Sequence, residues 1–180
     1  MGRQKKIPDG WLDYYPIKDI VYDARIVPFK CPLPERLFQN SSMVSYKWTP
    51  ADVMQRVPNL GMVIDLTFKF PAYYNPQEFL DCGVQYKKIG CVGHDVPQEE
   101  NFFELLNTVE SFMTSNARND LVIGLHCTHG VNRTGYMLCR LLVERLRYTP
   151  GQALEAFACS RGYPLERENY REAIYNLELR

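Results

Sequence analysis

The sequence of 180 residues lacks any apolar run near the 18 or so residues that cross a membrane, and no apolar stretch follows its basic start. It also lacks an excess of either charge, because 21 basic residues balance 21 acidic ones. No overall field therefore attracts the chain to nucleic acid or to a membrane surface. We expect a protein of the nucleus, the cytoplasm or both, with no membrane partner.

Metal-ligand spacing is missing as well. The six cysteines include no Cys-x-x-Cys pair and follow no regular spacing. The three histidines also have no partner residues at the sequence spacing typical of metal ligands. These absences argue against a zinc site and against a disulfide framework. We expect no metal and no cofactor, and five of the six cysteines are expected to be reduced residues of the core or near the surface.

Internal repeats, low-complexity tracts and Gly/Ser linkers are absent too, so residues 1–180 are expected to form a single domain. A hydrophobic content of 46% and a charged content of 23% are typical of a globular chain. Residues 1–20 are expected to be a surface-packed N-terminal extension. Prolines and glycines exclude regular structure there, whereas Trp11, Tyr14 and Tyr15 favour packing along the body.

Hydrophobic periodicity and helix-boundary residues predict strands that alternate with helices. The expected strands cover residues 24–27, 60–67, 84–89 and 121–125. The expected helices cover residues 50–57, 76–82, 98–115, 136–146, 150–160 and 166 onward. This alternation predicts an α/β fold with a central, mostly parallel sheet and helices on both faces. Arg140, Arg145 and Arg147 on one helix are expected to be solvated.

Residues 126–135 read His-Cys-Thr-His-Gly-Val-Asn-Arg-Thr-Gly and join an expected strand to an expected helix. In such a layout, successive backbone N–H groups curl around an anion at the positive end of the helix. Cys127 at the mouth of the loop should have a pKa below the free value of about 8.5 and act as a nucleophilic thiolate. Arg133 can direct two N–H donors onto a tetrahedral oxyanion. The alternative is an inert buried thiol in a structural or degenerate loop.

The other loop residues have expected roles of their own. Thr134 is expected to hydrogen-bond the sulfur, and His126 to orient the loop through its ring nitrogens rather than to transfer protons. Asn132 is expected to tolerate unusual backbone angles. The candidate phosphate-binding residues of the loop are Thr128, His129, Gly130, Val131, Asn132 and Arg133.

The loop resembles the His-Cys-x5-Arg-Ser/Thr signature of the cysteine-dependent tyrosine and dual-specificity phosphatases. Its Thr-His-Gly-x-Asn-Arg-Thr-Gly core is similar to one branch, the RNA 5′-triphosphatases, which includes the amino-terminal domain of metazoan mRNA-capping enzymes. Residues 7–16 (IPDGWLDYYP), 28–33 (PFKCPL) and 161–170 (RGYPLERENY) resemble the subgroup of RNA- and ribonucleoprotein-interacting phosphatases. The resemblance spans essentially the whole chain and implies a protein-tyrosine-phosphatase-like fold.

One departure from the branch concerns the substrate. A basic residue usually precedes the aromatic pair, which is Tyr73-Tyr74 here, but Ala72 stands in that place, so either Lys69 substitutes or the contact is missing. The resemblance also places the carboxyl-terminal segment near the pocket, where Arg167 is expected to make a second phosphate contact. The alternative for Arg167 is an ordinary ion pair with Glu168 or Glu172.

Asp95 is the candidate general acid, because it lies 32 residues before Cys127, a spacing that resembles that of the acid in dual-specificity phosphatases. A tyrosine leaving group has a pKa of about 10 and needs such an acid. A departing diphosphate, with a pKa of about 6, can leave without one. Asp95 is otherwise a turn residue ahead of a helix.

The leading hypothesis is an RNA 5′-polyphosphatase that removes the γ-phosphate, and then the β-phosphate, from 5′-triphosphorylated RNA through a cysteinyl-phosphate without a metal. The alternative is a protein tyrosine or dual-specificity phosphatase. A third reading is a non-catalytic phosphate-binding module in an RNA–protein assembly. The implied partners are 5′-triphosphorylated RNA and ribonucleoprotein or small-RNA machinery, and a monomer is expected.

Overall fold

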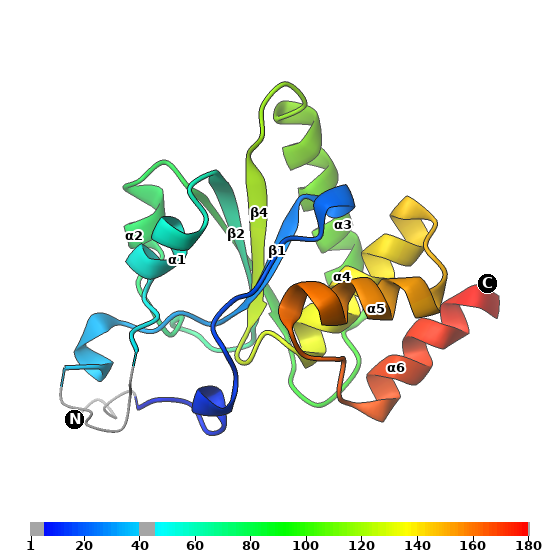
Figure 1. Cartoon of the computed structure of the whole chain (residues 1–180), viewed down its shortest axis with the longest axis horizontal. Coiled ribbons are helices and arrows are strands. Elements are labelled where there is room, and N and C mark those ends of the chain that lie inside the picture. The colour runs from blue at the N-terminus through cyan, green and yellow to red at the C-terminus, as the bar shows by residue number, and fades with distance from the viewer. Residues whose placement is uncertain (1–5, 40–45, 180) are drawn as a thin grey trace.

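The computed structural model describes residues 6–39 and 46–179, which build one four-stranded sheet between two groups of helices (Figure 1). The strands are β1 (Ile26–Lys30), β2 (Leu60–Thr67), β3 (Gln85–Cys91) and β4 (Val122–Cys127). They are all parallel and lie in the order β1-β4-β2-β3. Because β4 pairs with both β1 and β2, its carboxyl end emerges from the interior of the sheet.

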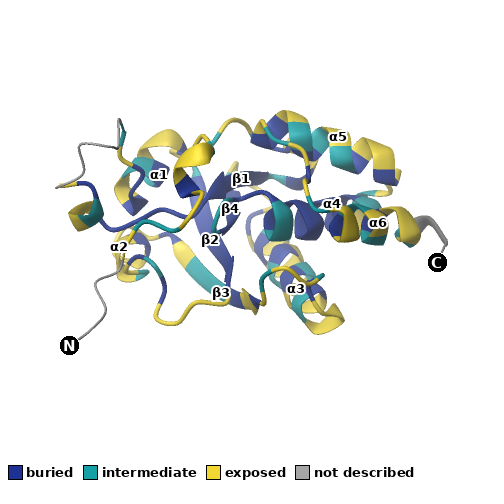
Figure 2. Cartoon of the chain, turned by 90° about the horizontal axis from the view of Figure 1, so that it is seen from below, coloured by how far each residue is buried: buried dark blue, intermediate teal, exposed yellow. Residues whose placement is uncertain are grey.

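Helices cover both faces of the sheet, as predicted. The helices are α1 (Pro50–Arg56), α2 (Gln77–Leu80), α3 (Glu99–Ser115), α4 (Asn132–Leu146), α5 (Pro150–Arg161) and α6 (Glu168–Tyr175). Figures 1 and 2 show α1 and α2 on one side of the sheet and α3 to α6 on the other. Two hydrophobic clusters correspond to these two sides. In the part of the chain that is described, no helix combines the length and apolarity needed to cross a bilayer.

Capping residues explain why two helices begin where the sequence predicts. Thr49 and Thr149 each form a capping box, and each is followed by a proline in the first helical turn. Gly162, with φ +83°, ends α5 in the left-handed conformation that favours glycine. The predicted helix 136–146 begins earlier, at Asn132, so the loop after β4 feeds directly into the first turn of α4.

The amino-terminal segment is fastened to the body of the protein through Trp11. Trp11 has no exposed surface, and its Nε1 donates a hydrogen bond to the Cys31 carbonyl at 2.8 Å. Trp11 therefore anchors the segment to the body of the protein, whereas Tyr15 is 75% exposed. The strand expected at residues 24–27 is also displaced, because Tyr22–Ala24 form a 3₁₀ turn before β1 begins.

Arg140 departs from its expected solvated state. Its side chain is 2% exposed and forms ion pairs with Glu99 at 2.6 Å and Glu144 at 2.7 Å. Its guanidinium also lies 4.0 Å from the centre of the Phe102 ring. These partners offset the cost of burying the charge, so Arg140 joins α4 to α3. Arg145 and Arg147 are exposed, as expected.

Candidate active site

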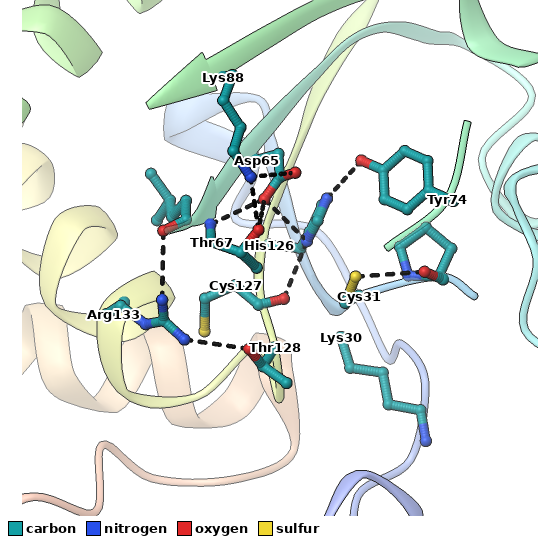
Figure 3. A network of polar contacts seen from close by, with 12 residues as sticks. Lys30, Cys31, Asp65, Thr67, Tyr74, Lys88, His126, Cys127, Thr128 and Arg133 are labelled. Atoms are coloured by element: carbon teal, nitrogen blue, oxygen red, sulfur yellow. Dashed lines mark hydrogen bonds and ion pairs between the residues drawn. The ribbon is translucent and has the colours of Figure 1, made fainter. Parts of the chain in front are cut away.

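The loop after β4 places the candidate nucleophile at the carboxyl end of the sheet. Cys127 is the last residue of β4, and α4 begins five residues later at Asn132. The Cys127 side chain is buried, and Figure 3 shows its sulfur pointing into the space between Arg133 and Thr128. The strand, loop and helix have the predicted layout, in which this space is the cradle for an anion; anion binding there stays a prediction.

Gly130 allows the loop to curl. Its φ of +70° lies in the left-handed region, which glycine adopts without a steric penalty. A Cβ at this position would overlap the carbonyl group of Phe29 and lie 2.8 Å from the backbone nitrogen of Lys30. The loop is therefore pressed against the end of β1, where Cys31 N–H also donates to the Thr128 carbonyl at 3.1 Å.

Gly130→Ala should destabilise the protein by roughly 2 kcal/mol or more, because it combines a positive φ with a backbone overlap. The measurement is the free energy of unfolding from a denaturant titration. The matched control is Gly151→Ala in α5, where an added Cβ meets nothing within 4 Å and alanine favours the helix. An unchanged unfolding midpoint for Gly130→Ala would contradict this description of the loop.

The electrostatics of the loop favour the Cys127 thiolate. Burial alone raises the pKa of this thiol. The Arg133 charge, the Thr134 hydroxyl and the backbone N–H groups of Thr134 and Gly130 outweigh burial, and the net pKa of Cys127 is lowered. The physical basis for an activated nucleophile is therefore present in the folded chain.

Thr134 brings a buried hydroxyl to the sulfur. The side chain has no exposed surface, and its Oγ1 meets no hydrogen-bond partner of normal geometry among the described residues. It nevertheless lies close enough to lower the pKa of Cys127. A buried hydroxyl left in this state is suited to hydrogen-bond the sulfur or a group bound to it, which stays a prediction for Thr134.

Arg133 is held where three strands end. Its Nη1 donates to the Cys91 carbonyl of β3 at 3.0 Å and to the Leu66 carbonyl of β2 at 3.5 Å. Its Nη2 donates to Thr128 Oγ1 at 3.1 Å. These contacts fix the half-buried guanidinium beside the sulfur, so the loop and the sheet edge position Arg133 together.

His126 makes the ring hydrogen bonds expected of an orienting residue. Its Nδ1 donates to the Cys127 carbonyl at 2.9 Å, and its Nε2 accepts a hydrogen bond from the Tyr74 hydroxyl at 2.7 Å. Burial lowers the pKa of His126, although the Asp65 carboxylate acts in the opposite direction. A neutral imidazole with both nitrogens engaged is suited to fixing the loop rather than to exchanging protons.

Asp65 lies beside His126, at 4.0 Å from its Nδ1, and was missed in the sequence. It has no exposed surface, and its carboxylate accepts a hydrogen bond from Lys88 Nζ at 2.9 Å (Figure 3). The Tyr86 hydroxyl donates to the same carboxylate, also at 2.9 Å. Burial raises the Asp65 pKa, but the Lys88 charge and the hydrogen bonds from Lys88 and Thr67 act in the opposite direction, and the net pKa is lowered. A carboxylate within an otherwise apolar strand was the available signal, because such a charge needs cationic partners.

Arg161 is a second residue that the sequence did not reveal. Its fully buried guanidinium donates to the carbonyls of Gly130 at 3.1 Å, His129 at 2.9 Å and Tyr15 at 2.8 Å. Burial lowers the pKa of Arg161 to about 10, so it remains a cation at neutral pH. It therefore holds the outer side of the loop by its carbonyl oxygens.

The His129 side chain points away from the cradle. Its Nε2 donates to the Asp9 carbonyl at 2.9 Å, and its ring packs 5.3 Å from that of Tyr14. The expected contribution of His129 to phosphate binding is therefore restricted to its backbone N–H group. Phosphate binding by His129, Thr128 and Val131 stays a prediction.

Asn132 attaches the carboxyl-terminal segment to the loop. Its Oδ1 accepts hydrogen bonds from the backbone N–H groups of Arg167 at 2.9 Å and Glu166 at 3.2 Å. The expectation of unusual backbone angles at Asn132 is wrong, because this residue begins α4 and the positive φ of the loop belongs to Gly130. The side chain, not the backbone, gives Asn132 its role.

Arg167 is consequently placed beside the cradle, half-buried at the start of α6. Glu168 pairs with Arg171, and Arg167 forms no ion pair within residues 6–39 and 46–179. Burial raises the pKa of Tyr170 to about 12, while the charges of Arg133 and Arg167 act in the opposite direction. The charges of both arginines thus act on the same hydroxyl, and the second phosphate contact of Arg167 stays a prediction.

Asp95 lies exposed on the segment between β3 and α3. The Tyr170 hydroxyl donates to the Asp95 carbonyl at 2.7 Å, and Asn169 Nδ2 donates to the His94 carbonyl at 3.1 Å. Residues of α6 therefore fasten the backbone of this segment near the cradle. The role of the Asp95 carboxylate as a general acid stays a prediction.

Lys69 lies exposed on the segment that follows β2. Its Nζ is 4.6 Å from the centre of the Tyr73 ring. Burial raises the pKa of the Tyr73 hydroxyl, and a contact with the Thr128 side chain offsets part of that rise. Tyr73 thus connects Lys69 to the loop, whereas Ala72 is buried.

All six cysteines are unpaired, and no group of three or more His, Cys, Asp or Glu side chains in the described residues could hold a metal ion. Residues 44–180 match the family model for the dual specificity phosphatase catalytic domain. The chain belongs to this family. The predicted phosphatase fold and the resemblance to its RNA-related branch are confirmed by this match and by the relatives that follow.

Three curated relatives illustrate the similarity. The RNA/RNP complex-1-interacting phosphatase of Homo sapiens is 38% identical over 97% of this chain and 53% of its own length. Its Caenorhabditis elegans homolog is 36% identical over 97% of this chain and 77% of its own. A tyrosine-protein phosphatase of Autographa californica nuclear polyhedrosis virus is 36% identical over 91% of this chain and 95% of its own. The chain therefore spans about half the length of the human relative.

Two solved structures show the same fold. Tk-PTP in its active form has a TM-score of 0.68 and 19% identity, over 92% of this chain and 99% of its own. PTPMT1 has a TM-score of 0.66 and 16% identity, over 91% of this chain and 94% of its own. At these identities the likeness concerns the fold alone.

Proposed function

We propose that this protein is an RNA 5′-polyphosphatase, which removes the γ-phosphate and then the β-phosphate from 5′-triphosphorylated RNA without a metal ion. The observation that carries the proposal is the buried Cys127 sulfur between Arg133 and Thr128, in a loop whose arginine and N–H groups lower the pKa of this thiol. The relatives named for RNA/RNP complexes support RNA as the substrate. The matching partners are ribonucleoprotein or small-RNA machinery, in the nucleus or the cytoplasm, with the protein acting as a monomer.

The reaction has two steps. The Cys127 thiolate attacks the terminal phosphorus in line, so that a sulfur–phosphorus bond forms and the shortened RNA leaves with the electrons of the broken phosphorus–oxygen bond. Water then attacks the cysteinyl-phosphate, which releases inorganic phosphate and restores the thiolate. The loop N–H groups and Arg133 stabilise the equatorial oxygens, and the Thr134 hydroxyl hydrogen-bonds the sulfur as it departs.

Cations beyond the loop support a polyphosphate substrate over a single phosphate group. Arg167 is half-buried beside the loop without an ion pair among the described residues, and Lys69 lies exposed over Tyr73. A triphosphate extends its remaining charges past the cradle, where such cations can bind them. Arg167 is accordingly proposed to bind the second phosphate.

The proposal is tested by comparing phosphate release from a 5′-triphosphorylated oligonucleotide with release from phosphopeptides, followed by analysis of the final RNA end. We expect a higher kcat/KM for the RNA and a 5′-monophosphate product. A preference for phosphopeptides would instead establish a protein phosphatase. The similarity of this chain to the viral tyrosine-protein phosphatase is the observation that favours this alternative.

A chelator such as EDTA should leave this RNA activity unchanged, because the cysteinyl-phosphate route uses protein donors for every charge that develops. The measurement is the initial rate of phosphate release before and after dialysis against EDTA. Inhibition that is reversed by adding back a divalent cation would contradict the proposed mechanism.

A further inference from the structure

An exposed aromatic pair follows the end of β2. Phe68 is 65% exposed and Phe70 is 92% exposed, and the exposed Lys69 stands between them. Neither phenylalanine ring is part of the two hydrophobic clusters. Exposing two large rings on one short loop forfeits the burial that normally stabilises phenylalanine, which indicates a surface that binds another molecule.

This loop borders the cradle. Leu66 and Thr67 complete β2, and the Leu66 carbonyl already contacts Arg133. On the far side of the loop, Lys69 lies over the Tyr73 ring, and Tyr73 contacts the side chain of Thr128. The loop is therefore tied to the phosphate-binding residues at both ends, and its exposed rings lie outside the site where the terminal phosphate would bind.

We infer that Phe68 and Phe70, with Lys69 between them, form a stacking platform for the first bases of the single-stranded RNA substrate. The inference rests on the proposed function and assigns the part of the site that distinguishes RNA from a bare polyphosphate. When the γ-phosphate occupies the loop, the other phosphates extend across the rim and the first nucleosides lie beyond it. Aromatic faces bind every base by stacking, and a lysine between them binds the connecting backbone.

The test is the double variant Phe68→Ala/Phe70→Ala, measured on two substrates with the same terminal phosphate. A 5′-triphosphorylated oligonucleotide offers bases, whereas inorganic triphosphate offers none. We expect KM for the oligonucleotide to rise about tenfold or more, with kcat nearly unchanged, and no change for inorganic triphosphate. Tyrosine or tryptophan at both positions should restore the wild-type KM.

The matched control is Tyr22→Ala, which removes a 74% exposed aromatic ring before the amino end of β1, at the opposite end of the strands. This variant should leave KM and kcat unchanged for both substrates. An unchanged oligonucleotide KM in the double variant would overturn the platform, and so would equal losses on both substrates. Loss of binding to phospholipid vesicles, with unchanged RNA kinetics, would assign the rings to a lipid surface instead.

The proposed function and the platform fail in different ways. If the wild-type protein releases no phosphate from the oligonucleotide, the proposed function is wrong. The platform is then tested separately by the dissociation constant of the same oligonucleotide, measured by fluorescence anisotropy. Weaker binding in the double variant supports the platform, and unchanged binding overturns it.

Discussion

Cys127→Ser should abolish phosphate release from 5′-triphosphorylated RNA while leaving RNA binding largely intact. A serine hydroxyl is far less acidic than a thiol, so the attacking anion is lost, and we expect the rate to fall by about 10⁴-fold or more. The contacts that hold Arg133 come from Cys91, Leu66 and Thr128, and none of them involves the sulfur. The measurements are single-turnover phosphate release and the dissociation constant of the labelled oligonucleotide.

The matched control is Cys159→Ser, which changes an exposed cysteine of α5 and should retain full activity. A near-wild-type rate in Cys127→Ser would contradict the mechanism. The wild-type protein offers a second check, because the pKa of Cys127 is lowered by Arg133 and the loop N–H groups against the effect of burial. Activity should therefore persist at pH values below the ordinary thiol pKa of about 8.5.

The centre of the site was predictable because it is local in sequence. Cys127, Arg133 and Thr134 fall within eight consecutive residues, so a single strand, loop and helix places all three. The predicted strand at residues 60–67 and the long helix at residues 98–115 were also close to β2 and α3, since their apolar residues recur with a clear period. The spacing of apolar residues within each segment was therefore sufficient to predict these two elements.

The support of the site was not predictable in the same way. Asp65, Lys88 and Arg161 come from different elements, and only the assembled sheet brings their charges to the loop. Arg161 ends α5, where a basic residue is expected from the helix dipole alone, so its burial had no local signal. The proline and glycine around Trp11 predicted no regular structure, but Trp11–Asp13 form a short 3₁₀ helix. They carried no information about burial, which depends on contacts with Cys31 and its neighbours.

The role of Asp95 separates the two substrate classes most sharply. Asp95→Asn should barely slow hydrolysis of 5′-triphosphorylated RNA but should reduce turnover of phosphotyrosine substrates by about 10²-fold or more. A diphosphate leaving group, with a pKa of about 6, departs as an anion without receiving a proton. A phenol, with a pKa of about 10, requires one.

The structure makes this substitution a clean test. The contacts that fix the segment reach the backbone carbonyls of Asp95 and His94, from Tyr170 and Asn169 respectively, so an asparagine side chain leaves them in place. Glu100→Gln, which neutralises an exposed carboxylate five residues further along the chain, is the matched control and should affect neither substrate. The measurement is kcat/KM for each variant on both substrates. Equal losses of kcat/KM on RNA and phosphotyrosine would show that the leaving group does not determine the need for an acid. Only Arg167 and Lys69 would then favour a polyphosphate substrate.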